Sequence, residues 1–363
     1  MRIALLGTDG LPARYGGFET CVEHLAPILS KLGHEVVVIG SCVGRREKMT
    51  EYRGVCVRYI NMRANGLSSI IYDGLSLARA LRSAEVAVLF GVSGGGWIPF
   101  LRLAKRNFKI IVNVDGLDSQ RSKWGMLTRR IIAASEFLAV NYADAIVSDN
   151  KFIGVRVFSR YRRESKVIAY GNDHVRFLRE AESRRIVDAL TGWSDRAFCL
   201  TIARAEPENM LLEMIEGFRA SSAESYVLVS NFQATAYGSR LKELFRKDGR
   251  IKLIDAVYDA DVLAALRQEC SAYLHGHSVG GTNPSLIEML PYSKPIIAYD
   301  CDYNRWSLDN GGAYFLSSND LAKTLDDPNR EQFVPRCSVE LQKRYSWVEI
   351  AEQYASIMRE ALA

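Results

Sequence analysis

The feature that most constrains the fold is a series of short, continuous apolar runs, several of which end at a glycine. In the first half of the chain these runs are RIALLG, EVVVIG, EVAVLFG, KIIVNVDG and DAIVSDN. Continuous apolar runs of this length are typical of parallel strands that are buried on both faces. An amphipathic stretch at residues 18–33 lies between the first two runs. The pattern therefore predicts alternating strands and helices around a parallel sheet.

A second series of the same kind begins after a polar, charge-rich stretch near residues 171–194. Its strands are FCLTIARAE, SYVLVSN, IKLID, AYLHGH and PIIAYD, and residues 208–218 form an amphipathic helix. A chain of 363 residues is also too long for one ordinary hydrophobic core. We therefore expect an α/β protein with two doubly wound, Rossmann-like domains, whose ligands bind at the carboxyl ends of the strands.

The composition excludes several classes of protein. Hydrophobic residues make up 48% of the chain and charged residues 25%, as in ordinary globular proteins. The seven cysteines are scattered and form no C-x-x-C pair, which predicts reduced thiols in a cytoplasmic protein and not a disulfide scaffold or a zinc site. No run approaches the ~20 apolar residues that a membrane-spanning helix needs. The sequence also lacks a nucleic-acid-binding signature.

Charge is distributed unevenly along the chain. Residues 1–170 contain 25 Lys and Arg against 14 Asp and Glu, whereas residues 171–363 contain 22 against 28. A basic first half is typical of a surface that meets anionic lipid or a lipid-linked diphosphate. It is equally typical of a solubilising face without a partner. The charge pattern alone leaves both interpretations open.

The segment HGHSVGGTNPSLIEML, residues 275–290, carries the most specific chemistry. Gly280 and Gly281 form a turn whose backbone N–H groups are open to an anion, and Asn283 is a typical helix N-cap. Glu288 follows a little over one helical turn later, so its carboxylate can accept hydrogen bonds from a hydroxyl-bearing group. A phosphate beside a diol describes a sugar nucleotide. The alternative is an ordinary loop-to-helix turn with a solvated glutamate.

Four other groups of candidate residues lie at or after the ends of predicted strands. Gly16 and Gly17 form a short loop before a helix, which makes a second helix start that can accept an anion. Arg204 ends the strand FCLTIAR, where its guanidinium suits a diphosphate; an ion pair with a nearby glutamate is the alternative. Asp115 ends the strand KIIVNVD and can accept a hydrogen bond from a sugar hydroxyl or act as a base. His277 lies two residues after another histidine with no nearby cysteine or acid, so we expect no metal there.

Five segments, in the same order, resemble those of glycosyltransferase family 4, the retaining GT-B enzymes. They are closest to the branch of bacterial rhamnosyltransferase-like proteins with the signatures G-T-x-G-(I/L)-P-A-x-Y-G-G-F-E-T and GGTNPSL(I/L)E. The matching segments are GTDGLPARYGGFET (7–20), NVDGLDSQRSKWG (113–125), ARAEPEN (203–209), GGTNPSLIE (280–288) and YSWVEIAEQY (345–354).

This resemblance implies the GT-B fold, in which two Rossmann-like domains face each other across a cleft and the last helix crosses back to the first domain. The first domain is then residues 1–172 with the crossing helix 346–363, on the acceptor side. The second domain is residues 173–345, which bind the nucleotide-sugar donor. A last helix that caps the second domain is the alternative.

The resemblance also assigns roles to residues. The donor nucleotide and its diphosphate are bound by Gly16, Gly17, Arg204, Asn209, Gly281, Thr282, Asn283 and Glu288. Acceptor or sugar contacts come from Arg14, Tyr15, Arg121, Lys123, His277 and Gly280. Asp115 contacts the sugar or the acceptor and is the less favoured candidate for a base, because in retaining GT-B enzymes the donor phosphate is thought to take the acceptor proton. No metal and no cofactor is implied.

The chain departs from the family at three positions. Gly280 stands where the family has the first of two glutamates, and Asn209 stands where most members have a lysine. Asp9 stands where the branch usually has arginine. A missing carboxylate at position 280 suits a deoxysugar donor. The alternative is that Gly280 is required by a positive φ.

The implied activity is the transfer of L-rhamnose from a dTDP- or UDP-linked donor, with dTDP-rhamnose as the preferred prediction. The acceptor would be a polyprenyl-diphosphate-linked or free glycan in capsule, O-antigen or exopolysaccharide biosynthesis, at the inner face of the plasma membrane. Two alternatives remain: a nucleotide-sugar 2-epimerase of related architecture, and a non-catalytic partner subunit, which Gly280 and Asn209 favour.

Overall fold

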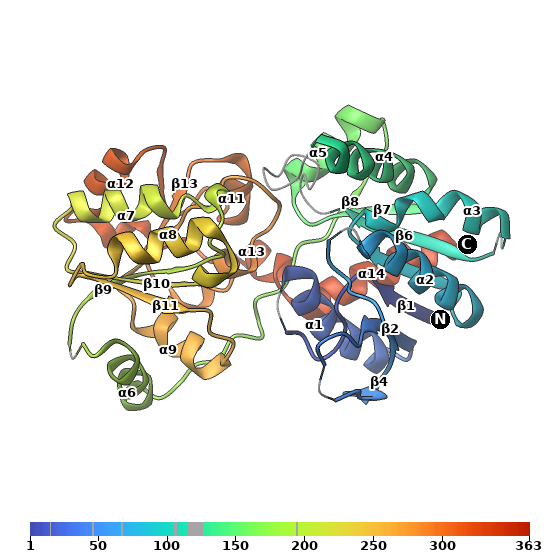
Figure 1. Cartoon of the computed structure of the whole chain (residues 1–363), viewed down its shortest axis with the longest axis horizontal. Coiled ribbons are helices and arrows are strands. Elements are labelled where there is room, and N and C mark those ends of the chain that lie inside the picture. The colour runs from blue at the N-terminus through green and yellow to red at the C-terminus, as the bar shows by residue number, and fades with distance from the viewer. Residues whose placement is uncertain (15, 46, 67, 105–106, 115–125, 194) are drawn as a thin grey trace. The chain divides into compact units, whose positions relative to one another are not determined.

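The computed structural model describes residues 1–14, 16–45, 47–66, 68–104, 107–114, 126–193 and 195–363 (Figure 1). Contacts between residues divide the chain into two compact units. The first unit consists of Met1–Gly171 and Lys343–Ala363, and the second of Asn172–Gln342.

The first unit is built on an eight-stranded sheet in the order β3-β4-β2-β1-β5-β6-β7-β8. All neighbouring strands are parallel except β3 and β4. The five strands predicted in this half are present. The strands are β1 (Arg2–Leu6), β2 (Glu35–Ser41), β3 (Glu51–Tyr52), β4 (Val55–Ile60), β5 (Val86–Phe90), β6 (Lys109–Val114), β7 (Ala145–Ser148) and β8 (Lys166–Val167).

Helices cover both faces of this sheet. Right-handed crossovers put α1 on one face and α2 to α5 on the other. In agreement, α1 packs against α14, whereas α2, α3 and α4 pack around a short 3-10 helix at Ser93–Trp97. The helices are α1 (Gly17–Lys31), α2 (Ser68–Ser83), α3 (Ile98–Ala104), α4 (Met126–Tyr142), α5 (Lys151–Tyr161) and α14 (Trp347–Leu362).

The last helix, α14, belongs to the core of the first unit. Trp347 lies against Gly171, where a Cβ would come within 2.5 Å of the indole ring, and stacks on His24 at 5.2 Å between ring centroids. The Tyr354 hydroxyl accepts a hydrogen bond from Asn113 Nδ2 at 2.6 Å, next to the end of β6. Its buried side chains, among them Ile350, Tyr354 and Met358, recur at helical spacing along one side of the helix.

The second unit has a six-stranded, fully parallel sheet in the order β11-β10-β9-β12-β13-β14. Its strands are β9 (Phe198–Ile202), β10 (Ser225–Ser230), β11 (Ile251–Asp255), β12 (Ala272–His275), β13 (Ile296–Tyr299) and β14 (Ala313–Phe315). The five predicted strands are therefore present here too, and β14 is additional.

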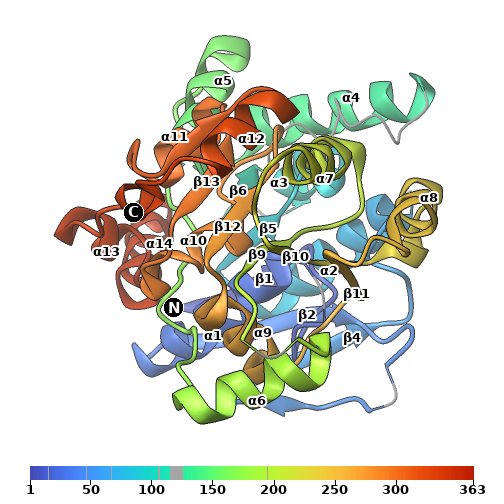
Figure 2. The same cartoon turned by 90° about the vertical axis from the view of Figure 1, so that its left-hand side faces the viewer.

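Figure 1 shows α7, α8 and α12 on one face of this sheet and α6 and α9 on the other, and Figure 2 shows the same elements after a turn of 90°. The predicted helix at 208–218 corresponds to α7, on which Leu211, Ile215 and Phe218 are fully buried in the core. The helices are α6 (Glu180–Thr191), α7 (Leu211–Ala220), α8 (Ala236–Phe245), α9 (Ala260–Glu269), α10 (Pro284–Ile287), α11 (Asp302–Ser307), α12 (Ser318–Leu325) and α13 (Val339–Arg344).

One helix lies where the sequence analysis predicts only a polar stretch. Helix α6 occupies residues 180–191 and packs against α9 through Ser183 and Val187, which are buried. Its mean hydropathy is low and its buried face carries few apolar side chains, so the segment has the composition of a polar loop. Apart from this helix, the predicted α/β fold with two Rossmann-like units is confirmed.

Candidate functional site

Each sheet has a switch point, where the chain leaves a central strand toward opposite sides. In the first unit β1 lies between β2 and β5, and in the second unit β9 lies between β10 and β12. Ligands of doubly wound sheets bind outside the carboxyl ends of the strands at such points. The loops at these two points are residues 7–16 in the first unit and residues 203–210 and 276–283 in the second. They contain most of the predicted site residues.

The loop after β1 runs so close to the neighbouring strands that it needs glycine. Gly7 has a φ of +86°, and a Cβ there would collide with the Phe90 carbonyl oxygen of β5. Gly10 has a φ of +89°, and a Cβ there would lie 2.6 Å from Gly40 Cα of β2. Positive φ and the lack of space both exclude other residues. The backbone of this loop is therefore held at the switch point itself.

Arg14, a predicted ligand contact, is engaged by other residues of the chain. Its guanidinium donates to Asp9 Oδ2 from Nε at 3.0 Å and from Nη2 at 2.6 Å. It also donates to the carbonyl oxygens of Gly44 at 2.7 Å and Val43 at 3.2 Å. Asp9 therefore provides the partner for Arg14, which is a physical reason for an acid at this position. Arg14 clamps the loop in this structure, and its predicted contact with an acceptor remains untested.

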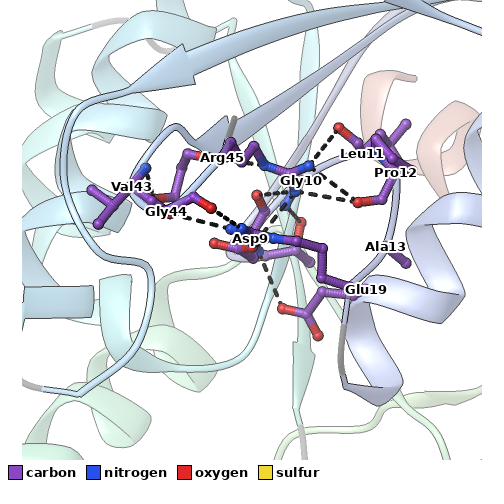
Figure 3. A network of polar contacts seen from close by, with 12 residues as sticks. Asp9, Gly10, Leu11, Pro12, Ala13, Glu19, Val43, Gly44 and Arg45 are labelled. Carbon is purple, nitrogen blue, oxygen red and sulfur yellow. Dashed lines mark hydrogen bonds and ion pairs between the residues drawn. The ribbon is translucent and has the colours of Figure 1, made fainter. Parts of the chain in front are cut away.

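Arg45 makes a second clamp on the same loop, and sequence reasoning did not single it out. Its side chain is 5% exposed. It donates to the carbonyl oxygens of Asp9 at 2.8 Å, Leu11 at 3.0 Å, Pro12 at 3.2 Å and Ser41 at 3.1 Å (Figure 3). Backbone carbonyls have no sequence signature, so no pattern marks this arginine among the many basic residues of the first half.

The predicted anion-accepting start of α1 holds a carboxylate of the chain itself. Gly16 precedes α1 with a φ of +120°, and Glu19 turns back so that one oxygen occupies the position of a Cβ on residue 16. The other oxygen accepts a hydrogen bond from the Asp9 backbone N–H at 3.1 Å. Burial raises the pKa of Glu19, which favours its neutral form. A phosphate at Gly16 and Gly17 would therefore meet Glu19, a residue that the sequence analysis did not consider.

Four predicted site residues, Tyr15, Asp115, Arg121 and Lys123, lie outside the described residues. The last described residues of β6 are Asn113 and Val114.

In the second unit, Arg204 follows β9 and is 33% exposed. Its Nη1 lies 3.5 Å from Glu206 Oε1, which is the ion pair considered as the alternative to diphosphate binding. The second carboxylate oxygen of Glu206 is buried and has no hydrogen-bond partner among the described residues. A partly exposed guanidinium at this distance from one carboxylate oxygen keeps N–H donors for a further anion. The ion pair and a diphosphate contact are therefore compatible.

Asn209 is buried and fixes the ring of His277. Its Nδ2 donates to the Arg204 carbonyl oxygen at 2.8 Å, which leaves its Oδ1 as an acceptor. This oxygen lies 2.5 Å from His277 Nδ1. Because an amide oxygen carries no proton, Nδ1 must donate, and Nε2 of the neutral ring is an acceptor. Asn209 thus acts through His277 in this structure, whereas the sequence analysis predicts a direct contact with the diphosphate.

Gly280 has two structural reasons to be glycine. Its φ is +139°, in a region that only glycine adopts readily. A Cβ at this position would lie 2.6 Å from His277 Nε2, so the imidazole occupies the space of a side chain at residue 280. These features account for glycine without reference to the transferred sugar. The prediction that Gly280 selects a deoxysugar therefore has no separate support in the structure.

The turn after Gly281 has the predicted cap but a shorter helix. Asn283 Oδ1 accepts from the Ser285 backbone N–H at 3.1 Å and from Ser285 Oγ at 2.9 Å, and Thr282 is buried. Helix α10 ends at Ile287, so Glu288 lies just beyond the helix and not inside it. The sequence pattern identifies a helix start reliably because the cap is local, but it does not limit the helix length.

Glu288 faces a cation and a histidine of the chain. One oxygen forms an ion pair with Arg267 Nη2, and the other lies 3.4 Å from His174 Nε2. The carboxylate is 12% exposed, and Arg267 is 7% exposed. The sequence analysis missed both partners. A ribose hydroxyl at Glu288, as predicted, would donate to a carboxylate whose orientation Arg267 already fixes.

His275 is a structural residue. Its ring is fully buried against Tyr273, and burial lowers its pKa to about 3, so it is neutral. Its Nε2 has no hydrogen-bond partner among the described residues. Within the same part of the chain, no three or more His, Cys, Asp or Glu side chains are placed to hold a metal ion.

The comparisons with known proteins concern the fold above all. A family described as "Domain of unknown function (DUF1972)" matches residues 1–173. No protein among the curated sequences matches this chain.

Several solved structures are similar over the whole chain at low sequence identity. Sucrose-phosphate synthase from Thermosynechococcus elongatus has a TM-score of 0.79 and 17% identity, covering 99% of this chain and 98% of that chain. Anabaena Alr3699/HepE in complex with UDP-glucose has a TM-score of 0.77 and 15% identity, covering 99% and 100%. A glycosyltransferase from Rickettsia africae has a TM-score of 0.75 and 14% identity, covering 99% and 98%. The chain therefore has the GT-B fold of these proteins.

Proposed function

We propose that this protein is a glycosyltransferase that takes its sugar from a nucleotide-sugar donor. The observation that carries the proposal is the switch point of the second unit. Strands β9 and β12 are neighbours there. Arg204 follows β9, and the turn at residues 280–283 and Glu288 follow β12. The similar HepE structure, which has the same fold, holds UDP-glucose.

In the proposed reaction these residues bind and orient the donor. Arg204 and the backbone N–H groups of residues 281–283 offset the negative charge that grows on the diphosphate as the bond between the sugar C1 and its oxygen breaks. Glu288 accepts hydrogen bonds from the ribose. The acceptor oxygen bonds to C1 with retention, and the departing phosphate oxygen takes the acceptor proton. Asp115 remains a proposed contact of the sugar or the acceptor, and no metal or other cofactor takes part.

The proposed donor is dTDP-rhamnose, and the proposed acceptor is a lipid-linked or growing glycan in capsule, O-antigen or exopolysaccharide biosynthesis. The support is the set of five ordered segments that resemble the rhamnosyltransferase-like branch. The proposed location is cytoplasmic, at the inner face of the membrane, which agrees with the excess of basic residues in the first half. None of the helices that the structure describes is long and apolar enough to span a membrane.

A panel of nucleotide sugars tests this proposal. We expect dTDP-rhamnose to raise the melting temperature and to be slowly hydrolysed, more than UDP-glucose, UDP-galactose, UDP-N-acetylglucosamine or GDP-mannose. Glu288→Gln should weaken nucleotide binding by roughly 1.5–3 kcal/mol, the contribution of a hydrogen bond to a charged group. Hydrolysis of a different donor would correct the sugar assignment. A C2 epimer among the products would indicate an epimerase, and failure of every nucleotide to bind would contradict the proposed function.

A further inference from the structure

Helices α3, α4 and α5 of the first unit expose many large apolar side chains. The three most exposed large apolar side chains among the described residues all lie on these helices: Leu103 at 82%, Met126 at 74% and Phe100 at 68%. The same helices also expose Ile131, Phe137, Tyr142, Val155 and Phe158. Exposed apolar side chains that gather on one region mark a surface that binds a protein or a membrane.

The spacing of these side chains puts them on common faces. Phe100 and Leu103 are three residues apart on α3, and Val155 and Phe158 are three residues apart on α5. Residues three, four or seven apart share one side of a helix. On α4, Met126 and Phe137 are eleven residues apart, close to three full turns. Each helix therefore presents an apolar stripe to solvent.

Contacts at the surface join the three helices. Arg102 on α3 donates to the Tyr142 carbonyl oxygen at the end of α4 at 2.7 Å. Phe137 on α4 meets Tyr161 on α5, with ring centroids 6.2 Å apart. Figure 1 shows the three helices next to one another in the first unit. The three helices are thus in contact in sequence order, and we call their exposed sides together the α3–α5 surface.

The charges on the α3–α5 surface have one sign. Every exposed charged side chain that the structure describes on these helices is basic: Arg102, Arg129, Arg130, Lys151 and Arg160. The one acidic residue on the three helices, Glu136, is buried and accepts a hydrogen bond from the Tyr161 hydroxyl at 2.7 Å. A surface that is apolar and basic is complementary to the interface of an anionic bilayer, where phosphates lie above the acyl chains.

We infer that the α3–α5 surface docks the protein onto an anionic lipid bilayer. This inference deepens the membrane location proposed above by naming the surface that makes it. The apolar side chains enter the boundary between headgroups and acyl chains, and Arg129, Arg130 and Lys151 lie at the phosphates. Arg102 and Arg160 are paired with Asp144 and Glu136 of the chain itself. A second copy of the chain fits less well, because a two-fold dimer would bring two basic faces together without acidic partners.

Flotation of the full-length protein with vesicles tests the apolar part. Wild type should float with vesicles of phosphatidylglycerol and phosphatidylcholine and stay behind with phosphatidylcholine alone. Leu103→Ser should weaken vesicle binding roughly tenfold, because the variant loses the free energy of transferring a leucine side chain from water into the bilayer. Leu316→Ser is the matched control, since Leu316 is 64% exposed in the second unit. Circular dichroism checks that both variants are folded. Equal flotation with both lipids, or equal binding by the two leucine variants, overturns the inference.

A pair of charge reversals tests the basic part. Arg129→Glu with Arg130→Glu should abolish binding to anionic vesicles, and binding by wild type should fall as salt is added. Arg246→Glu with Lys247→Glu is the control, an adjacent exposed basic pair on the second unit. Light scattering gives the remaining outcome: a dimer in solution that Leu103→Ser dissociates would assign the surface to a second copy. Nucleotide binding is measured separately and tests the proposed donor site. A failure of vesicle binding would therefore contradict the docking surface and not the donor site.

Discussion

The hydrogen bonds around Asn209 determine which nitrogen of His277 carries the proton. Because the Arg204 carbonyl oxygen accepts from the Asn209 amide N–H, the amide oxygen must accept from His277 Nδ1. The other ring nitrogen, Nε2, lies in the space that a side chain on residue 280 would fill. The Arg204 carbonyl, the Asn209 amide, the His277 ring and Gly280 therefore form one interdependent cluster and not four independent contacts. Within this cluster, His277 Nε2 is the ring nitrogen through which a bound nucleotide sugar could be contacted.

Two variants of His277 separate a ligand role from a structural one. Asparagine places an N–H near the position of Nδ1 and lacks Nε2, whereas glutamine places an amide near the position of Nε2. If Nε2 meets the donor, His277→Asn should lose more nucleotide-sugar affinity than His277→Gln, by about 1 kcal/mol or roughly fivefold. Calorimetry with the preferred donor measures this difference. The reverse order would mean that His277 only supports Asn209.

Buried His275 predicts a loss of stability in mild acid. Burial lowers the pKa of this ring to about 3. The unfolded chain takes up a proton below about pH 6.5, but the folded protein does not until about pH 3, so acid favours unfolding in this range. At pH 5 the free energy of unfolding should be about 2 kcal/mol lower from this residue alone.

Urea unfolding at pH 7 and pH 5 checks this value. His275→Gln has no titrating ring, so its difference between the two pH values should be smaller than that of wild type by about 2 kcal/mol. The absolute stability of the variant does not enter the comparison. An unchanged pH difference would show that the folded ring takes up its proton at an ordinary pH.

At the scale of elements, the conformation of the loop between β12 and α10 requires glycine at position 280. Gly280→Ala should destabilise the protein by roughly 1–3 kcal/mol, because alanine adopts a φ near +139° poorly and its methyl group meets His277. Gly249→Ala is the control, since nothing lies within 4 Å of a Cβ there. Urea unfolding gives the stabilities. If Gly280→Ala keeps its stability and changes only the choice of donor, glycine is present for sugar selection.

At the scale of the whole molecule, the chain returns at its end to complete the first unit. Trp347→Ala removes a buried indole that lies on Gly171 and should cost about 3–5 kcal/mol. Val348→Ala is a control from the neighbouring residue, which is 52% exposed. Hydrogen exchange should increase in peptides of the first unit and stay unchanged in those of residues 172–342 after Trp347→Ala. Increased exchange confined to the second unit would contradict this assignment.

The elements of both sheets could be predicted because the signals are local. A continuous apolar run, a helical period and a cap such as Asn283 each depend on residues within one or two turns of one another. These signals predicted the ten strands and the two Rossmann-like units, whereas the GT-B fold and the crossing last helix were implied by the resemblance to a known family. They failed at α6, whose buried face carries few apolar side chains, and at the end of α10, where no local signal marks the stop.

The sequence by itself also identified the loops of the candidate site, because each of these loops follows a predicted parallel strand and so lies at the carboxyl end of that strand. Only the tertiary structure decided what their side chains contact. Arg14 meets Gly44 from 30 residues away, and Glu288 meets Arg267 from 21 residues away. Contacts between residues so far apart depend on how the sheets and helices pack in three dimensions. A local sequence pattern therefore does not predict them.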